Sequence, residues 1–169
     1  MNQSEKRQFL IQSLLKERPE YRDLSIQAES ESQRQLLRGL MNIRAPRRMD
    51  AEFLKTQDEY LQAETAAKGI TDIDDLTPVQ PRLYLWQGDI TTLRCDAIVN
   101  AANSGMTGCY IPNHRCIDNA IHTFAGVELR LACAELMRQQ GYPEPTGQAK
   151  ITPCLLYTSP SPRDRTRSR

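Results

Sequence analysis

The chain has 169 residues, of which 39% are hydrophobic, and these values are typical of an ordinary soluble domain. Its formal net charge of +1 depends on the last sixteen residues, because the remainder holds 18 basic against 20 acidic residues and lacks the basic face of a nucleic-acid-binding protein. No apolar run approaches the roughly 18 residues that a membrane span needs, and the polar N-terminus is unlike a secretory signal, so we expect a cytoplasmic protein without nucleic-acid or membrane partners.

Residues 1–77 are predicted to form a helical extension. Apolar side chains recur at helical spacing in three runs, at residues 4–18, 30–43 and 50–68. Ser4 is the expected cap of the first helix, and Pro19 ends it. We interpret the apolar stripes as surfaces on which the helices pack, and not as sites of chemistry.

From about residue 78 the pattern changes to a mixture of strands and helix. Short apolar runs predict strands at residues 83–86, 95–99 and 148–152, each buried on both faces. A Gly- and Asn-rich loop, residues 100–116, leads into one long predicted helix at residues 117–140. The order strand, strand, loop, helix, strand indicates an α/β fold with crossover connections.

Residues 154–169 match neither of the preceding segments. They are rich in Ser, Pro and Arg, which alone indicates a disordered tail. The ten residues 155–164 also correspond to one reading frame of a transposase adapter used in sequencing libraries. We therefore expect residues 154–169 to be a non-native tail, and we exclude them from functional interpretation.

Three potential metal ligands are spaced along the loop as Cys-x4-His-x-Cys, at Cys109, His114 and Cys116. Two thiolates and an imidazole form a tetrahedral zinc set with one open position, which distinguishes catalytic zinc from structural zinc. On spacing alone, two core thiols and a surface histidine are an equal alternative. The sequence contains no CxxC pair, so we do not expect a disulfide framework. Cys95 and Cys133 are expected to be small buried side chains.

The sequence Ile117-Asp118-Asn119 places a carboxylate at the start of the long predicted helix. Free backbone N–H groups at a helix start attract anions such as phosphate. His122 follows one turn later on the same face. The helix start and the side chains of Asp118 and His122, placed next to zinc, indicate a site for a phosphate-bearing ligand. The alternatives are that Asp118 only caps the helix and that His122 is a hydrogen-bonded structural imidazole.

Three stretches of the sequence, QGDIT, DAIVNAAN and IDNAIH followed by AG, resemble the opening half of macrodomains that bind ADP-ribose. The insertion GCYIPNHRC, where MacroD-type relatives carry glycines, is similar to a zinc-dependent microbial branch that also has an N-terminal helical extension. The resemblance implies a three-layer α/β/α fold, of which residues 78–153 form the N-terminal part. The family places further strands and a second phosphate-binding loop after Pro153, so we expect the chain as written to be truncated and inactive.

The resemblance also implies roles for individual residues. Asp89 accepts a hydrogen bond from the adenine amino group, and the backbone of Ile90 lies beside it. Asn103 holds the distal ribose and forms the catalytic pair with Asp118, while Ile117 completes the contacts with ADP-ribose. The zinc ligands of the family correspond to Cys109, His114 and Cys116. Asn100, by contrast, is expected to be structural and to tie down the turn after its strand.

These implications converge on a hydrolase that removes mono-ADP-ribose from modified proteins, with zinc as its cofactor. Breaking a bond at an anomeric carbon passes through an oxocarbenium-like transition state, which carboxylates and a positioned water serve. Zinc could activate that water, or orient the ribose hydroxyls and the scissile oxygen, and both roles stay open. The alternatives are a module that binds ADP-ribose without cleaving it, and a helical interaction module attached to an inert remnant.

Overall fold

The structure is a computed structural model that describes residues 1–21 and 23–153. The expected non-native tail, residues 154–169, lies outside the described residues. In chain order the α-helices are α1 (Gln3–Lys16), α2 (Ser30–Ile43), α3 (Ala51–Lys68), α4 (Ile117–Phe124) and α5 (Val127–Gln140). The strands are β1 (Thr71–Asp72), β2 (Pro78–Gln80), β3 (Leu83–Tyr84) and β4 (Leu93–Arg94), and the 3-10 helices are η1 (Pro19–Tyr21), η2 (Ile73–Asp75) and η3 (Ile90–Thr92).

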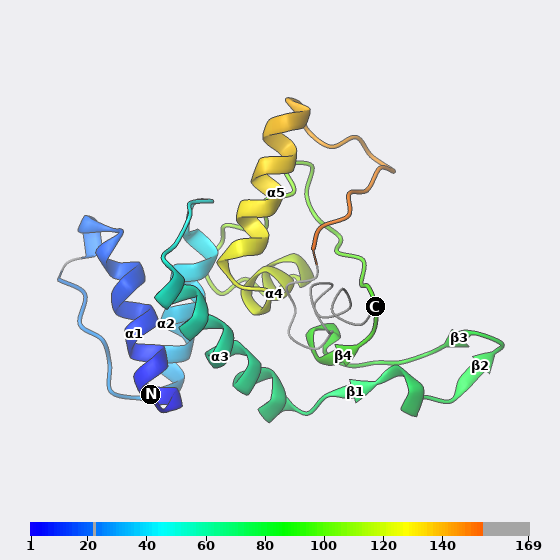
Figure 1. The fold of residues 1–169 in the computed structure, drawn as a ribbon, viewed down its shortest axis with the longest axis horizontal. Helices are drawn as coiled ribbons and strands as arrows, with labels where there is room; N and C mark the ends of the chain where they lie inside the picture. Colours follow the sequence, from blue (N-terminus) through cyan, green and yellow to red (C-terminus); the bar gives the residue numbers. More distant parts are fainter. Residues whose placement is uncertain (22, 154–169) are drawn as a thin grey trace, which may run out of the picture.

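The three predicted N-terminal helices are present, and α1 packs against both α2 and α3 (Figure 1). α2 begins and ends at the predicted residues, and Asp50 caps α3 by accepting a hydrogen bond from the amide of Phe53 at 2.8 Å. The predicted cap of α1 is wrong. Asn2 takes that position instead of Ser4, because its side chain and that of Glu5 each accept a hydrogen bond from the other's backbone amide.

The apolar stripes of these helices meet in one hydrophobic core, as predicted, and α5 also contributes to it. Its buried members are Leu10, Ile11, Leu14, Leu37, Leu40, Met41, Phe53, Tyr60, Leu61 and Val127. Each large apolar side chain buried here stabilises the fold by about 1.5–3 kcal/mol relative to its exposed form. A second cluster lies between α4 and α5 and comprises Ile121, Ala125, Leu129 and Cys133. Because Val127 belongs to the first core, α5 is fixed directly against the helical extension.

The single helix predicted at residues 117–140 is two helices, α4 and α5, separated at Ala125 and Gly126. Gly126 has φ +79°, a left-handed conformation that a side chain disfavours. The fully buried Gln57 of α3 fills the space beside Gly126, and its Oε1 accepts a hydrogen bond from the amide of Val127 at 2.9 Å. Gln57 therefore caps the first turn of α5 from a distant helix, which helical periodicity alone does not reveal.

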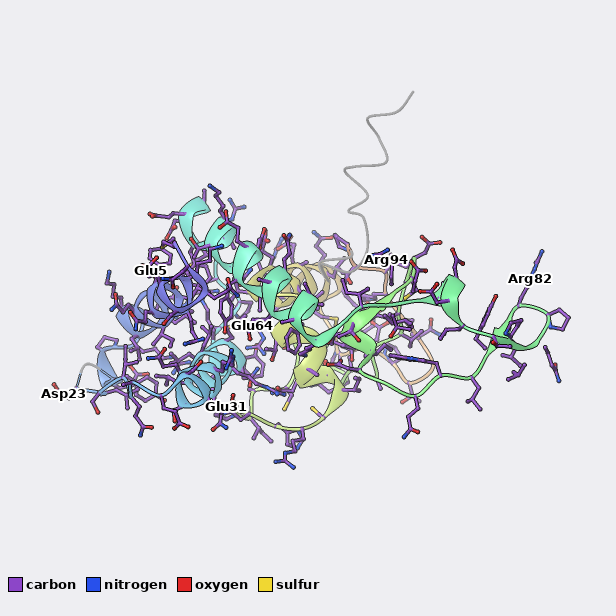
Figure 2. The ribbon with its side chains drawn as sticks, turned by 90° about the horizontal axis from the view of Figure 1, so that it is seen from below. Glu5, Asp23, Glu31, Glu64, Arg82 and Arg94 are labelled. Atoms are coloured by element: carbon purple, nitrogen blue, oxygen red, sulfur yellow. The ribbon has the colours of Figure 1, made fainter. Side chains whose placement is uncertain are left out.

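The predicted buried strands are wrong in most of their length. Of residues 83–86, only β3 forms a strand, and it pairs antiparallel with β2 in a hairpin whose residues are exposed. The hairpin projects away from the helices (Figure 1), and Arg82 at its turn lies at the opposite end of the molecule from Glu5 (Figure 2). β4 pairs in parallel with β1 just before the predicted run at residues 95–99, and neither that run nor residues 148–152 form a strand.

The physical reason is that these apolar runs have no strand partner among the described residues. Val99 is 87% exposed and Ile151 is 96% exposed, so neither run is buried on both faces. A strand depends on the hydrogen-bond ladder of a neighbour, which local composition cannot supply. The described part of the chain is thus a mixed but mostly helical structure with two two-stranded sheets. None of its helices combines the length and the apolarity that crossing a bilayer requires.

Candidate functional site

The structure brings together the three predicted metal ligands, Cys109, His114 and Cys116. Their ligand atoms all lie within 4.8 Å of one another, and the Sγ of Cys109 is 3.5 Å from the Nδ1 of His114. A turn closed by the hydrogen bond from the amide of His114 to the carbonyl of Ile111 (3.3 Å) returns the imidazole towards Cys109. This geometry favours the metal site over the alternative of two core thiols and a surface histidine.

The donor set and its spacing fit a zinc ion. Tetrahedral zinc with bonds of about 2.0–2.3 Å places its ligand atoms roughly 3.3–3.8 Å apart, so the cluster needs only small side-chain shifts to close on an ion. Cys116 is also the N-cap of α4, and its sulfur accepts a hydrogen bond from the amide of Asn119 at 3.4 Å. The helix start therefore places positive partial charge next to a sulfur that must carry negative charge to bind metal.

The remaining cysteines of the described residues do not join this cluster. Cys133 is buried between α4 and α5 as expected, and burial raises the pKa of its thiol, which keeps it protonated. Cys95 was expected to be buried too, but it is only half-buried, because it follows the short strand β4 instead of lying inside a covered one. Neither residue is a candidate ligand.

Asp118 is buried in the first turn of α4, directly after the metal cluster, and is 5% exposed. Its Oδ1 accepts a hydrogen bond from the Nδ2 of Asn100 at 2.7 Å and lies 3.6 Å from the Nε2 of His122. Since Cys116 is the cap of α4, the alternative that Asp118 only caps this helix is wrong. Asn100, for which we expected a structural role, contacts the predicted catalytic carboxylate through this hydrogen bond.

His122 presents a neutral imidazole to Asp118. Burial lowers the pKa of His122 to about 4, against the attraction of Asp118 and with a contribution from Arg130. The ring packs against Gly108, the residue before the first metal ligand, where a Cβ would come within 2.8 Å of it. The Nδ1 of His122 and the Oδ1 of Asn100 are buried without a hydrogen-bond partner among the described residues. Polar atoms in this state are a feature of sites that bind water or ligand.

Arg130 of α5 is a further buried residue that sequence reasoning missed. It contacts residues 109–116, which carry the three predicted metal ligands and are named here the metal-binding loop. Its guanidinium donates to the carbonyls of Arg44 (2.7 Å) and Cys109 (3.4 Å) and lies 4.2 Å from the ring centre of Tyr110. Burial lowers the pKa of Arg130 below its ordinary value, with the nearby Asp118 acting in the opposite direction. One cation thus joins α5, the end of α2 and the start of the metal-binding loop.

Asp89, the predicted adenine acceptor, is the cap of η3. One carboxylate oxygen accepts from the amide (3.0 Å) and hydroxyl (2.7 Å) of Thr91, and the other accepts from the Nζ of Lys68 at 2.9 Å. Burial acts to raise the pKa of Asp89, but these hydrogen bonds outweigh it and hold the pKa below its ordinary value. Asp89 is therefore ionised at neutral pH, and the next residue, Ile90, packs against the second hydrophobic cluster.

Asn103 precedes the metal-binding loop, and Ile117 directly follows it. Asn103 is exposed, and its side chain accepts from the amide of Gly105 (3.0 Å) and donates to the carbonyl of Gly108 (3.3 Å), so it orders the approach to Cys109. Ile117 is 41% exposed at the first residue of α4. Ile117 thus directly follows the predicted ligand Cys116, and Asn103 contacts the carbonyl of Gly108, the residue before the predicted ligand Cys109.

Comparison with known proteins gives matches to one family. A model of the Macro domain matches residues 99–157. The chain is 57% identical over 159 residues to a protein-ADP-ribose hydrolase of Treponema medium, in an alignment that covers 92% of this chain and 61% of that protein. It is 47% identical over 146 residues to a protein of the same name from Staphylococcus aureus strain MRSA252, with 86% of this chain and 54% of that protein covered.

A more distant match is a probable bifunctional ADP-ribose hydrolase/ADP-ribosyltransferase of Fusarium oxysporum f. sp. cubense, 38% identical over 135 residues, which covers 73% of this chain and 23% of that protein. The chain spans 61% and 54% of the length of the two bacterial relatives. The family model, the long bacterial alignments and the cluster of Cys109, His114 and Cys116 agree with one another. On these findings the chain is similar over most of its length to part of bacterial protein-ADP-ribose hydrolases, and its residues 99–157 match the Macro domain.

Proposed function

We propose that this protein is a zinc-dependent hydrolase that removes mono-ADP-ribose from modified proteins. The observation that carries the proposal is the convergence of Cys109, His114 and Cys116 immediately before the buried carboxylate of Asp118. A module that only binds ADP-ribose needs a pocket, but it does not need a metal with an open position. The names of the bacterial relatives, protein-ADP-ribose hydrolases, support the same activity.

In this proposal each residue acts through its own chemistry. Zinc, when bound by the three ligands, supplies a Lewis acid next to the ribose. Asp118 is held in one orientation by Asn100 and faces a neutral His122, so its negative charge is available to a developing oxocarbenium ion or to a water proton. Asn103 contributes a carboxamide to the distal ribose, and the ionised Asp89 accepts a hydrogen bond from adenine.

We also propose that residues 78–153 are the N-terminal part of a three-layer α/β/α macrodomain and that residues 1–77 are its helical extension. The match of the Macro domain to residues 99–157 supports the first assignment. The packing of α1, α2 and α3 supports the second. In this arrangement β1, near the end of the extension, pairs in parallel with β4 of the domain part, so the short sheet connects the two parts.

The metal part of the proposal is tested with ligand variants of the full-length protein. Cys109→Ala, His114→Ala and Cys116→Ala should each lose most of the bound zinc, because two remaining ligands bind zinc too weakly, and each should lose the release of ADP-ribose. Zinc is measured by mass spectrometry, and release is measured from an ADP-ribosylated protein. Cys133→Ala is the matched control, since that buried thiol lies outside the cluster. Stoichiometric zinc and full activity in all three ligand variants would refute the metal site.

A second experiment separates cleavage from binding. Asp118→Asn should abolish release while ADP-ribose binding persists, because the amide keeps the shape of the carboxylate but not its charge. Asp89→Ala should weaken ADP-ribose binding by about 1.5–3 kcal/mol, which is the usual contribution of a hydrogen bond to a charged group. If the zinc-loaded, unmodified protein binds ADP-ribose and releases none from any modified substrate, the alternative of a pure binding module is correct.

A further inference from the structure

One face of α2 contacts the metal-binding loop, although the two segments are far apart in sequence. Arg38 donates through Nη2 to the carbonyl of His114 (3.0 Å), and through Nη2 and Nε to the Oδ1 of Asn119 (2.8 and 3.2 Å). Arg38 and Asn119 are separated by 81 positions in the sequence. The helical extension therefore touches the backbone of one metal ligand directly.

The second acceptor of Arg38, Asn119, connects to the other side of the loop. Its backbone amide donates to the Sγ of Cys116 (3.4 Å), and its Nδ2 donates to the carbonyl of Ile111 (3.1 Å). Arg38 thus bridges the carbonyl of His114 and a residue that contacts the sulfur of Cys116. The guanidinium can do this because it is a planar, permanently charged fork with several donors.

Asn42, one turn after Arg38 on α2, makes an independent connection to the same loop. It is 1% exposed, its Oδ1 accepts from the amide of Asn113 (3.0 Å), and its Nδ2 donates to the hydroxyl of Thr123 in α4 (3.0 Å). Asn113 precedes the ligand His114 and has φ +55°. Gly39 leaves room for this approach, since a Cβ there would already lie 3.4 Å from the Nδ2 of Asn113.

These contacts matter because the loop has little structure of its own. Residues 109–116 contain no helix or strand, and residues 110–115 are exposed. A segment of this kind loses much conformational entropy when it converges on an ion. Ties to a preformed helix remove part of that cost before the metal binds, which is how groups outside the ligand set raise metal affinity.

We propose that α2 of the helical extension is a positioning element of the metal centre and that Arg38 is its principal positioning residue. This inference rests on the proposed metal site at Cys109, His114 and Cys116, and it adds to that site a residue that does not bind the ion. Loss of Arg38 should release the carbonyl of His114 and the side chain of Asn119 together, so that two of the three ligands become less well placed.

The test is metal binding by the full chain, with zinc affinity measured against a chromophoric chelator. Arg38→Met keeps the apolar stem and removes the donors, and it should weaken zinc binding about 10- to 100-fold, the usual range for a residue that supports metal ligands. Arg34→Met is the matched control, because Arg34 lies one turn earlier on α2 and bonds to Glu64 and Ser30, away from the loop. The control should stay within about twofold of the unmodified chain.

A spectroscopic measurement distinguishes positioning from a general effect on stability. With Co²⁺ in place of zinc, the visible absorption of the unmodified chain should indicate tetrahedral coordination with two thiolates, and Arg38→Met should alter this spectrum while Arg34→Met should not. Arg38→Lys should recover only part of the affinity, since a single ammonium cannot bridge both acceptors.

Three results would overturn the inference in distinguishable ways. Unchanged zinc affinity and an unchanged Co²⁺ spectrum in Arg38→Met would remove the role of Arg38 and leave the metal site intact. An equal loss in Arg34→Met would show that α2 acts only through the stability of the helices. If the unmodified chain binds neither zinc nor Co²⁺, the proposed metal centre fails as well.

Discussion

Gly39 lies inside α2 where the helix faces the metal-binding loop, and its replacement by two residues of different size should have opposite consequences. In Gly39→Ala the new Cβ would lie 3.4 Å from the Nδ2 of Asn113 and 3.7 Å from the Cβ of Pro112, which are ordinary contact distances. Alanine also gains about 1 kcal/mol over glycine in a helix interior. Gly39→Ala should therefore raise the free energy of unfolding by about 1 kcal/mol, and the melting temperature by roughly 2–4 °C for a chain of this length, with unchanged zinc affinity.

Gly39→Leu should retain most of the helix-propensity gain but lose metal affinity. Leucine is also a good helix former, so the backbone contribution is similar. Its further carbon atoms, however, extend beyond the Cβ into the space of Pro112 and Asn113. Overpacking of this kind costs about 1–3 kcal/mol. If the loop takes up the displacement, zinc affinity falls by roughly 5- to 150-fold, because each 1.4 kcal/mol is a factor of ten.

The assay is a thermal melt of the metal-free chain followed by a zinc titration against a chelator. Gln35→Leu is the control, because Gln35 is an exposed residue four positions earlier on α2 and leucine there adds the same bulk towards solvent. Zinc affinity in this control should not change. A lower melting temperature in Gly39→Ala would refute the close packing of α2 on the metal-binding loop. Zinc affinity in Gly39→Leu equal to that of the unsubstituted chain would refute it as well.

Three more predictions concern residues around the site. Gly126→Ala should lower the free energy of unfolding by about 2–5 kcal/mol in urea denaturation. The φ angle of Gly126 is +79°, and the new Cβ would collide with the side chain of Gln57, so the buried hydrogen bond from Val127 to Gln57 would be lost. An unchanged urea midpoint would contradict this prediction. Burial lowers the pKa of His122 from 6.5 to about 4, so between pH 4 and 6.5 the unfolded chain binds more protons than the folded chain. The contribution of the neutral imidazole to the free energy of unfolding should therefore be fully present above pH 6.5 and should fall by about 3 kcal/mol as the pH drops towards 4. Urea midpoints measured across that range should depend less on pH in His122→Gln, and equal slopes would argue against the buried neutral imidazole. Lys68→Met should raise the pKa of Asp89 in a carbon NMR titration, because the ammonium that donates to its carboxylate is removed, and an unshifted titration curve would exclude that role for Lys68.

The N-terminal helices could be predicted because the signals that define a helix are local. Apolar residues at helical spacing placed α2, and Asp50 followed by an apolar run placed the start of α3. The cap of α1 was misplaced by only two residues, since Asn2 and Ser4 are both common caps and only the reciprocal bond with Glu5 distinguishes them. The break before α5 was missed because the apolar pattern continues across it, and what favours the break is Gln57, a residue of another helix.

The prediction of the strands was wrong for a related reason. The runs at residues 95–99 and 148–152 have the composition of buried strands, but a strand requires a paired neighbour and a covering layer, and both are non-local. Among the described residues the only parallel pairing is between β1 and β4, two residues each. Without these partners the two apolar runs leave Val99 and Ile151 exposed. Composition therefore predicted the tendency of these runs to form strands, but not whether strands form.

The site shows the same division between local and distant information. The predicted metal ligands lie within eight positions of one loop. Their spacing made convergence one of two equal interpretations, and the resemblance to zinc-dependent macrodomains favoured it. Arg130 and Arg38 reach the site from other helices, and their distance in sequence hides this proximity. Arg38 and Asn42 lie four residues apart on α2, but polar residues at this spacing recur along the helix, so the pair alone does not indicate a contact with the site.

In the proposed metal centre, metal binding and folding are coupled. Cys116 is both a predicted zinc ligand and the cap of α4, and α4 packs on α2 and on α5. An ion that fixes Cys116 also fixes the start of α4, and with it the buried Asp118 and the core around Ile121. Because an ion that binds only the folded chain stabilises it by the free energy of binding, each tenfold change in zinc affinity shifts the stability of this region by about 1.4 kcal/mol at saturating metal. The proposed metal centre therefore links α2 to the buried Asp118 through the metal-binding loop, without any direct contact between Arg38 and Asp118 being needed.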